Sequence, residues 1–185
     1  MGRRVKPDTA RPEASPAEFK AMAHPLRLRI LRLCLHESLT NKQIAEHLGQ
    51  DPATTLYHVR LLVRTGFLAP EAVRAGRRGA LEKPYRATGK SWVLAVPRPE
   101  DQLTSVLASL DALRAEITDS GPEGLVDNAR VGLQLTDDEV AELCDRFNAI
   151  VQEYAARPPT PGGARYGLAF TVHQQASTGS GSPAA

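Results

Sequence analysis

Residues 39–68 read LTNKQIAEHLGQDPATTLYHVRLLVRTGFL, and two helix starts lie within them. Thr40 and Gln43 have the spacing of a capping box, in which each side chain satisfies a free backbone N–H group. Gly49 can adopt the left-handed conformation that ends a helix. Asp51, which a proline follows, forms a second capped start. The stretch therefore predicts two short helices joined by a tight turn.

The second of these helices, residues 52–65, has one face for packing and another for contact. At helical spacing, one arc holds Thr55, Val59 and Leu62. The opposite arc begins with small and polar side chains and continues with arginines: Ala53, Tyr57, Arg60 and Arg64. A major groove needs close approach to base edges and cations for the flanking phosphates. The pattern indicates a DNA-reading helix-turn-helix; a solvated helix in an ordinary small helical domain is the alternative.

A hairpin is predicted directly after the second helix. An extended run from Gly66 to about Val73 and another over residues 84–88 flank a glycine-rich tip. The tip carries four cations, Arg74, Arg77, Arg78 and Lys83, against the single carboxylate of Glu82. Such a hairpin after a recognition helix is a wing, whose cations meet the DNA backbone or minor groove. The alternative is a solvated surface loop.

Charge divides the chain sharply, although the formal net charge is only +2. Residues 1–99 hold 18 Lys/Arg and 8 Asp/Glu, a formal charge of +10, whereas residues 100–185 hold 5 and 13, a charge of −8. A basic half of this kind favours a polyanionic partner. We expect double-stranded DNA to bind the first half of the chain.

From Phe19 to Trp92 the chain resembles the ArsR-type winged helix-turn-helix regulators. The segment FKAMAHPLRLRILRLCL is similar to their first two helices, broken at His24-Pro25, and AEHLGQDPATTLYHVRLLVRTGFL is similar to their reading unit. The resemblance implies a homodimeric, effector-responsive regulator, in most cases a repressor, that binds a near-palindromic operator. The effector's chemistry is left open.

The metal sites of that family are not expected here. Where its members carry a Cys-x-Cys pair, this chain has Thr40 and Lys42, and the segment 100–119 contains no histidine. The five histidines lack ligand spacing and are interpreted as surface, capping or packing residues, with His58 structural first and a phosphate contact second. We predict neither a metal nor a cofactor.

The remaining sequence predicts the rest of an α+β, mostly helical chain. Residues 1–15 are expected to be a disordered basic head, 16–96 the winged helix-turn-helix domain, and 174–185 a disordered tail. A helix over residues 100–119 bears a wide apolar stripe, assigned to dimerisation because a domain this small has little core to cover it: Leu103, Val106, Leu107, Leu110, Leu113 and Ile117. Packing against the first helix is the alternative.

A small C-terminal β-α-β unit is predicted over residues 125–173, for dimerisation or sensing. Apolar residues alternate over 129–135 and again over 166–172, and Thr136 begins a helix between the two runs. Two strands under one helix leave open edges, so we expect the sheet to be completed by the dimer mate or the winged domain.

The interpretation is a cytoplasmic, sequence-specific transcriptional regulator and not an enzyme, since no phosphate loop or nucleophile set is present. No membrane partner is expected. Cys34 and Cys144 lie among apolar residues and are predicted to be reduced thiols. The alternative function is a winged-helix protein-interaction module with the C-terminal unit as its functional surface. The predicted DNA contacts are Thr40, Lys42, Ala53, Thr54, Leu56, Tyr57, Arg60, Arg64, Arg74, Arg77, Arg78 and Lys83.

Overall fold

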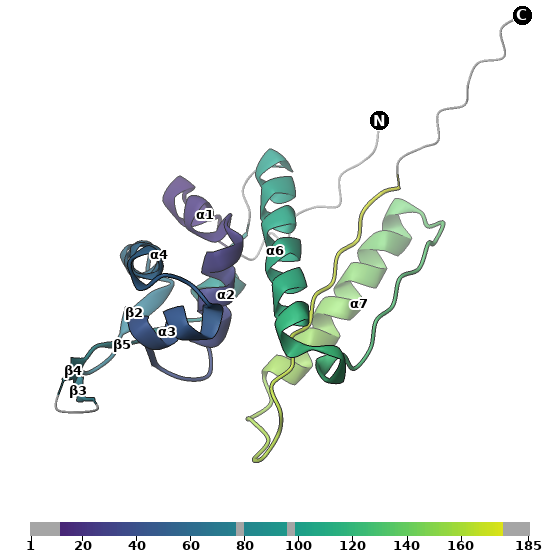
Figure 1. Ribbon diagram of the computed structural model, residues 1–185. Coiled ribbons are helices and arrows are strands. Elements are labelled where there is room, and N and C mark those ends of the chain that lie inside the picture. The colour runs from purple at the N-terminus through teal and green to yellow at the C-terminus, as the bar shows by residue number, and fades with distance from the viewer. Residues whose placement is uncertain (1–11, 77–79, 96–98, 176–185) are drawn as a thin grey trace, which may run out of the picture.

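A computed structural model describes residues 12–76, 80–95 and 99–175 (Figure 1). Its elements in chain order are α1 (Pro16–Met22), α2 (Pro25–Leu33), β1 (Leu39–Thr40), α3 (Asn41–Leu48), α4 (Pro52–Arg64), β2 (Leu68–Pro70), β3 (Arg74–Ala75), β4 (Leu81–Glu82), β5 (Pro84–Ala87), α5 (Lys90–Val93), α6 (Pro99–Ser120), the 3-10 turn η2 (Pro122–Gly124) and α7 (Asp137–Ala155). The predicted winged helix-turn-helix is confirmed. None of the described helices is long and apolar enough to cross a membrane.

Local sequence signals set the helix ends. The Thr40 hydroxyl accepts from the Gln43 N–H, and the Gln43 side chain accepts from the Thr40 N–H, so the predicted capping box forms. Gly49 ends α3 in the left-handed conformation, with φ of 59°. The Asp51 carboxylate then accepts from two N–H groups in the first turn of α4. The tight turn between α3 and α4 therefore follows from Gly49 and Asp51, which lie two residues apart.

The core lies where α2, α3 and α4 meet. Its fully buried members come from all three helices and from the chain after α4: Ile30, Cys34, Ile44, Val59, Leu62, Phe67 and Leu68. Burying such side chains is the main stabilising term of a small domain. It fixes α4 by one face and leaves the opposite face for contact.

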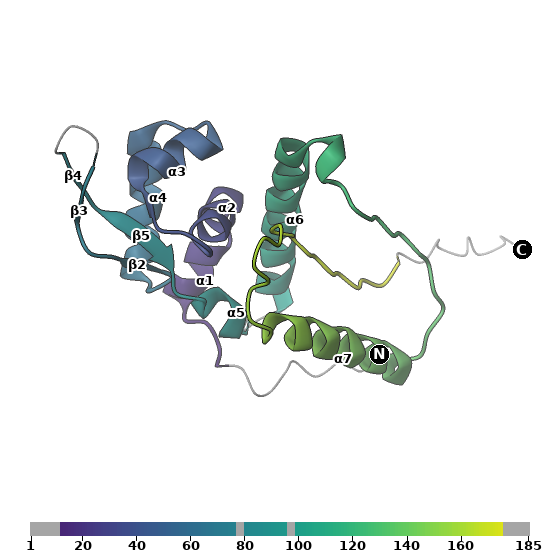
Figure 2. The same ribbon diagram turned by 90° about the horizontal axis from the view of Figure 1, so that it is seen from below.

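A small antiparallel sheet underlies the wing, which extends away from the helices (Figure 2). Its strand order is β1-β5-β2, with Leu39 opposite Tyr85 and Leu68 opposite Ala87. A second pair, β3 and β4, places Arg74 opposite Glu82 and continues the hairpin. The hairpin was expected from the sequence, whereas the two-residue strand β1 was not.

Helix α6 packs on α2 by one face and leaves its other face open. Ala108 and Ala112 are buried against the domain, and α2–α6 ion pairs join Arg29 to Asp119 and Arg32 to Glu116. Burial raises the pKa of Glu116, which the nearby Arg32 opposes. Intramolecular packing, which was the alternative, therefore occurs on one face of α6, against α2, whereas subunit pairing through the apolar stripe on the other face stays a prediction.

The predicted C-terminal β-α-β unit is corrected by the structure. Helix α7 is present and begins at the expected capping box of Thr136, but residues 125–136 and 156–175 form no strand. An alternating pattern becomes a strand only where a neighbouring strand pairs with its backbone, and this chain offers neither segment such a neighbour. Instead, the Phe170 ring stacks on Phe147 of α7, with ring centroids 3.8 Å apart.

The start of the described chain is more ordered than predicted. Glu13 forms a parallel bridge with Ala95, and the Ala14 N–H donates to the Ala95 carbonyl oxygen at 2.9 Å. Residues 12–15 are therefore not part of a disordered head. Residues 1–11 of that head, and residues 176–185 of the expected tail, lie outside the described residues.

Candidate nucleic-acid interface

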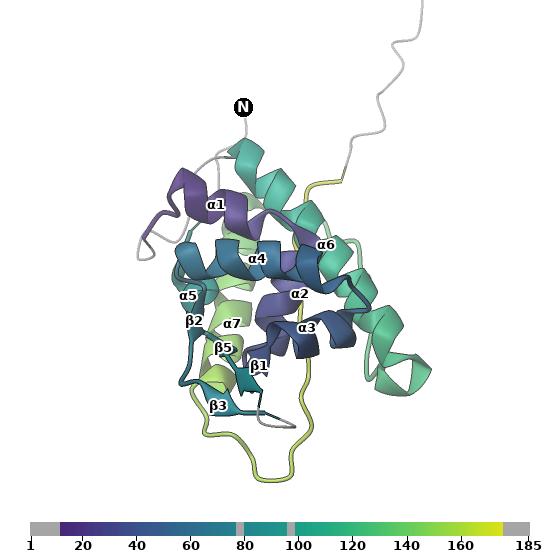
Figure 3. The same cartoon turned by 60° about the vertical axis from the view of Figure 1, so that its left-hand side comes forward.

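Helix α4 crosses one side of the domain between α1 and α3 (Figure 3). Its outer side is exposed as predicted: Ala53, Thr54, Tyr57, Arg60 and Arg64. Tyr57 has 63% of its surface exposed, whereas Leu56 is half-buried. Within the described part of the chain, no ion pair engages Arg60 or Arg64. This face can approach a groove without first breaking internal contacts.

The first turn of α4 is held tightly. Asp51 Oδ1 accepts from the N–H groups of Ala53 and Thr54 at 2.9 and 3.0 Å. The Asn41 side chain of α3 donates to the Pro52 carbonyl oxygen at 2.9 Å. The small side chains of the first turn therefore stand at a fixed distance from α3, as close approach to base edges requires.

The inner side of α4 contains polar groups as well as apolar ones. Thr55 is fully buried, and its hydroxyl donates to the Asp51 carbonyl oxygen at 3.0 Å. His58 is 7% exposed and lies 3.4 Å, Nδ1 to Nη1, from the buried guanidinium of Arg27. The structural interpretation of His58 agrees with this burial. Sequence reasoning missed Arg27, because an arginine in an amphipathic helix is ordinarily solvated.

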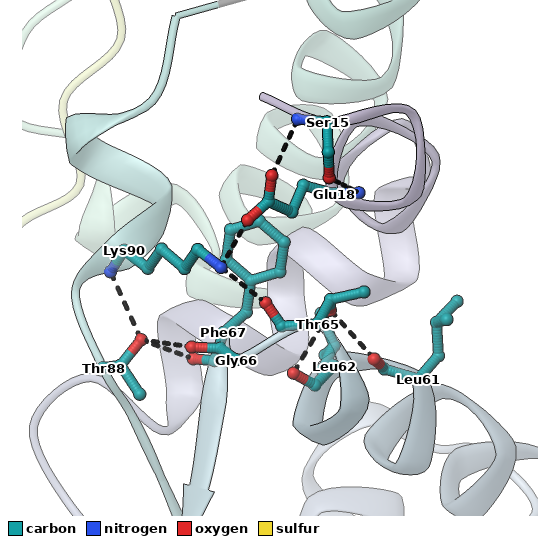
Figure 4. A network of polar contacts seen from close by, with 9 residues as sticks. All are labelled: Ser15, Glu18, Leu61, Leu62, Thr65, Gly66, Phe67, Thr88 and Lys90. Atoms are coloured by element: carbon teal, nitrogen blue, oxygen red, sulfur yellow. Dashed lines mark hydrogen bonds and ion pairs between the residues drawn. The ribbon is translucent and has the colours of Figure 1, made fainter. Parts of the chain in front are cut away.

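The last turn of α4 is bound by a polar network around Lys90 (Figure 4). The Lys90 ammonium donates to the Thr65 carbonyl oxygen at 2.8 Å and binds the Glu18 carboxylate. It also lies 5.4 Å from the centroid of the Phe67 ring. Hydrogen bonds from Lys90, which has the largest effect, and from Ser15 lower the pKa of Glu18 to about 2. Both ends of α4 are thus tied to the rest of the domain.

The residues outside α4 that are predicted to contact the DNA backbone differ in how accessible they are. Lys42 and Lys83 are exposed, whereas Thr40 is 8% exposed and its hydroxyl already serves the capping box. Arg74 lies 3.5 Å from both Glu82 and Gln43, so the wing reaches back to α3. The predicted contacts Arg77 and Arg78 lie outside the described residues.

The predicted dimerisation residues lie on the face of α6 that turns away from α2. Leu103, Val106, Leu107, Leu110 and Ile117 are between 36% and 63% exposed, and Leu113 is half-buried. Ala108 and Ala112 occupy the opposite side of the helix. The stripe is therefore an apolar surface that the described chain covers only in part.

Two hollows of about 220 Å³ each border α2 and α6 and share Arg32, Leu33 and Glu116. One is completed by the end of α3, the other by residues 165–167. Among the residues that the structure describes, no group of three or more His, Cys, Asp or Glu side chains could hold a metal ion.

Comparison with known proteins supports the helix-turn-helix domain. Residues 22–71 match a helix-turn-helix domain family, which spans the end of α1 through β2 and confirms the predicted motif. The structure of the transcriptional regulator SlyA aligns at 15% identity and a TM-score of 0.30, covering 69% of this chain and 72% of that one. The transcriptional regulator Tm0710 from Thermotoga maritima aligns at 13% and 0.28, covering 78% and 80%. No curated protein matches.

Proposed function

We propose that the protein is a sequence-specific transcriptional regulator that binds double-stranded DNA through α4. The observation that carries the proposal is the free outer face of α4, where Tyr57 and Arg60 project from a helix fixed at both ends. The +10 charge of residues 1–99 supports a polyanionic partner. In this proposal Ala53, Thr54, Leu56, Tyr57 and Arg60 face the base edges.

Backbone contacts come from the rim of this surface. Lys42 of α3, Arg64 at the end of α4, and Arg74 and Lys83 of the wing would neutralise phosphates, together with Arg77 and Arg78 of the wing tip. Thr40 contributes through its place at the start of α3, because its hydroxyl is already bonded. This division assigns sequence reading to α4 and most of the electrostatic affinity to the wing.

The regulator is proposed to act as a homodimer, and as a repressor, on a near-palindromic operator. The open stripe on α6 supports the pairing, because five large apolar side chains there are at least 36% exposed. A symmetric pair would present two α4 helices to successive major grooves, about 34 Å apart. The effector implied by the family resemblance would reach α2, α3 and α6 together in the hollow that Glu116 shares with His47 and Leu48.

An interaction module is the second candidate function. Large apolar side chains of the C-terminal segment, among them Val131 and Tyr166, are more than 70% exposed. A protein partner could cover them. This function does not need the basic face of the winged domain, so charge favours the DNA-binding proposal.

Selection of bound sites from random duplex DNA with the full chain tests the proposal. We expect an enriched, two-fold symmetric motif whose half-sites lie about one helical turn apart. The double variant Tyr57→Ala/Arg60→Ala is the negative control, because both changes lie on the exposed face of α4 that is proposed to read bases. It should not enrich that motif. A library without any enriched motif would favour the interaction module.

A further inference from the structure

Three positively chargeable groups meet between α2 and the inner side of α4. The rings of His24 and His58 have centroids 4.8 Å apart, and Arg27 Nη1 lies 3.4 Å from His58 Nδ1. Arg27 and His58 are each 7% exposed. Close packing of such groups is costly if all of them carry charge, so their protonation states matter to the position of α4.

The guanidinium of Arg27 is held by backbone and not by a carboxylate. Its Nε donates to the Ala21 carbonyl oxygen at 2.5 Å and its Nη2 donates to the Lys20 carbonyl oxygen at 2.6 Å. These carbonyls end α1, where the helix dipole favours a cation. Because arginine stays charged, the cluster always contains one positive charge and, within the described residues, no anion that pairs with it.

The hydrogen bonds require both imidazoles to be neutral. His24 caps α2 by accepting the Leu26 N–H on Nδ1 at 3.2 Å. Arg27 can only donate, so His58 must offer it the lone pair of Nδ1. A proton on either Nδ1 atom would remove an acceptor and place a donor against a donor.

The surroundings of His58 offer nothing to offset a second charge. The groups that bear on it are His24 and Arg27, and burial together with these two neighbours lowers the pKa of His58. Burial and Arg27 likewise lower the pKa of His24. Tyr57 is the adjacent titratable group on α4 itself, and β2 contributes none. On α1, Glu18 is half-buried and bound by Lys90. The other titratable side chains of α1 and α3 are exposed: Lys20, Lys42, Glu46 and His47.

We propose that His24, Arg27 and His58 form a pH switch that releases the recognition helix: protonation of His58 opposes the Arg27 guanidinium, loosens α4 from α2 and weakens DNA binding. This inference rests on the proposed role of α4. His58 follows Tyr57 directly, and their rings meet edge to face at 5.3 Å, so a displaced His58 moves an exposed side chain of the proposed reading face.

The direction of the effect follows from the lowered pKa values. The pKa values of His24 and His58 are lower in the folded protein than in the unfolded chain, so the two neutral rings stabilise the folded state. This stabilisation is complete above the ordinary histidine pKa of 6.5. It is lost as the pH falls below 6.5 and through the lower pKa values of the folded protein. The docked state of α4 should therefore persist at pH 7.5 and weaken in mildly acidic solution.

The central test compares operator affinity at pH 7.5 and pH 5.5 in wild type and His58→Asn, at constant ionic strength. The asparagine amide oxygen can occupy the Nδ1 position and accept from Arg27, but it does not titrate. We expect wild type to bind several-fold more weakly at pH 5.5 than at pH 7.5, and the affinity of His58→Asn to change by less than about 2-fold. His173→Asn, at an exposed histidine outside the domain, is the matched control and should behave as wild type. An equal loss in His58→Asn and wild type would overturn the switch.

A second measurement needs no DNA and separates this inference from the proposed function. Hydrogen exchange of the α4 amides, corrected for the intrinsic pH dependence, should show lower protection at pH 5.5 in wild type. Unchanged protection would overturn the switch even if DNA binds, while lost protection without any DNA binding would contradict only the proposed function. If His58→Asn does not fold, His24→Asn, which keeps a good N-cap residue, should raise the pKa of His58 and move the transition to higher pH; an unmoved transition counts against the cluster.

Discussion

Lys90 joins Glu18 to the end of α4, because one ammonium group binds the Glu18 carboxylate and the Thr65 carbonyl oxygen. Glu18 is also the capping-box partner of Ser15, so the contact links the start of α1 to the last turn of the recognition helix. Glu18, Thr65 and Lys90 thereby connect α1, the end of α4 and α5 beside the buried ring of Phe67.

Replacing Lys90 by Met should raise the pKa of Glu18 from about 2 toward the ordinary 4.5, since the bond to Lys90 is the largest cause of its lowering. In wild type the carboxylate stabilises the fold above pH 4.5, and this contribution is lost as the pH falls toward 2. Carbon-detected NMR titration of Glu18 measures the change. Glu123→Gln, in an exposed turn, is the control and should leave that pKa in place.

Tyr57→Ala and Arg60→Ala should each weaken operator binding by about 1 to 3 kcal/mol, because both remove contacts to base edges. Circular dichroism should show unchanged helix content, since both side chains are exposed. Fluorescence anisotropy with the selected operator measures the loss. Unchanged affinity in both variants would remove this face of α4 from sequence reading.

The double variant Arg77→Gln/Arg78→Gln should weaken binding to all duplexes alike. Two lost phosphate contacts lower the slope of log K against log[salt] by about 2 through reduced counterion release. Titrations at several salt concentrations give the slope, with Arg146→Gln/Arg157→Gln on and after α7 as a charge-matched control. A change in sequence preference at constant slope would mean that the wing reads bases.

Leu110→Glu should convert the proposed dimer to a monomer that loses operator binding but keeps most of its helix content. The charge falls in the middle of the open stripe, where a partner would have to desolvate it. Light scattering at micromolar concentration measures the mass. Ser109→Glu places the same charge one residue away and should remain dimeric. Wild type that is monomeric while binding its operator fully would exclude the dimer from the mechanism.

Cys34 should resist thiol reagents in the native protein. It is fully buried, and burial raises its pKa to about 12. In a Cys144→Ser background at pH 8, reaction with a disulfide reagent should be at least about 100-fold slower than in the unfolded chain, because the thiolate is the nucleophile. Equal rates in the two states would show that Cys34 is accessible.

The sequence predicted those parts of the fold that short-range rules determine. The caps at Thr40, Asp51 and Thr136 each depend on residues within three positions, and all three form. The packing arc of α4 follows from helical spacing and is buried as expected. The two short segments of β1 and β5 pair over a distance of more than 40 residues, which no local pattern of two residues could reveal.

Long-range contacts explain where the prediction failed. The alternation over 166–172 is genuine, but the segment packs through Phe170 on a helix instead of pairing with a strand. Arg27 belongs to the recognition-helix junction only because the carbonyls that end α1 meet it there. The residues next to Phe170 and Arg27 in the sequence predict neither the contact with Phe147 nor the contact with the carbonyls that end α1.

In the proposed dimer, the close contact of α6 with α2 would set the distance between the two operator half-sites. Small side chains at Ala108 and Ala112 set how near the two helix axes come, and helix spacing depends on the residues at the contact. In the proposed dimer the two α6 helices meet at the symmetry axis. The distance between α2 and α6 therefore determines how far apart the two α4 helices lie. The number of base pairs between half-sites would then depend on the small side chains of Ala108 and Ala112, which do not contact the DNA.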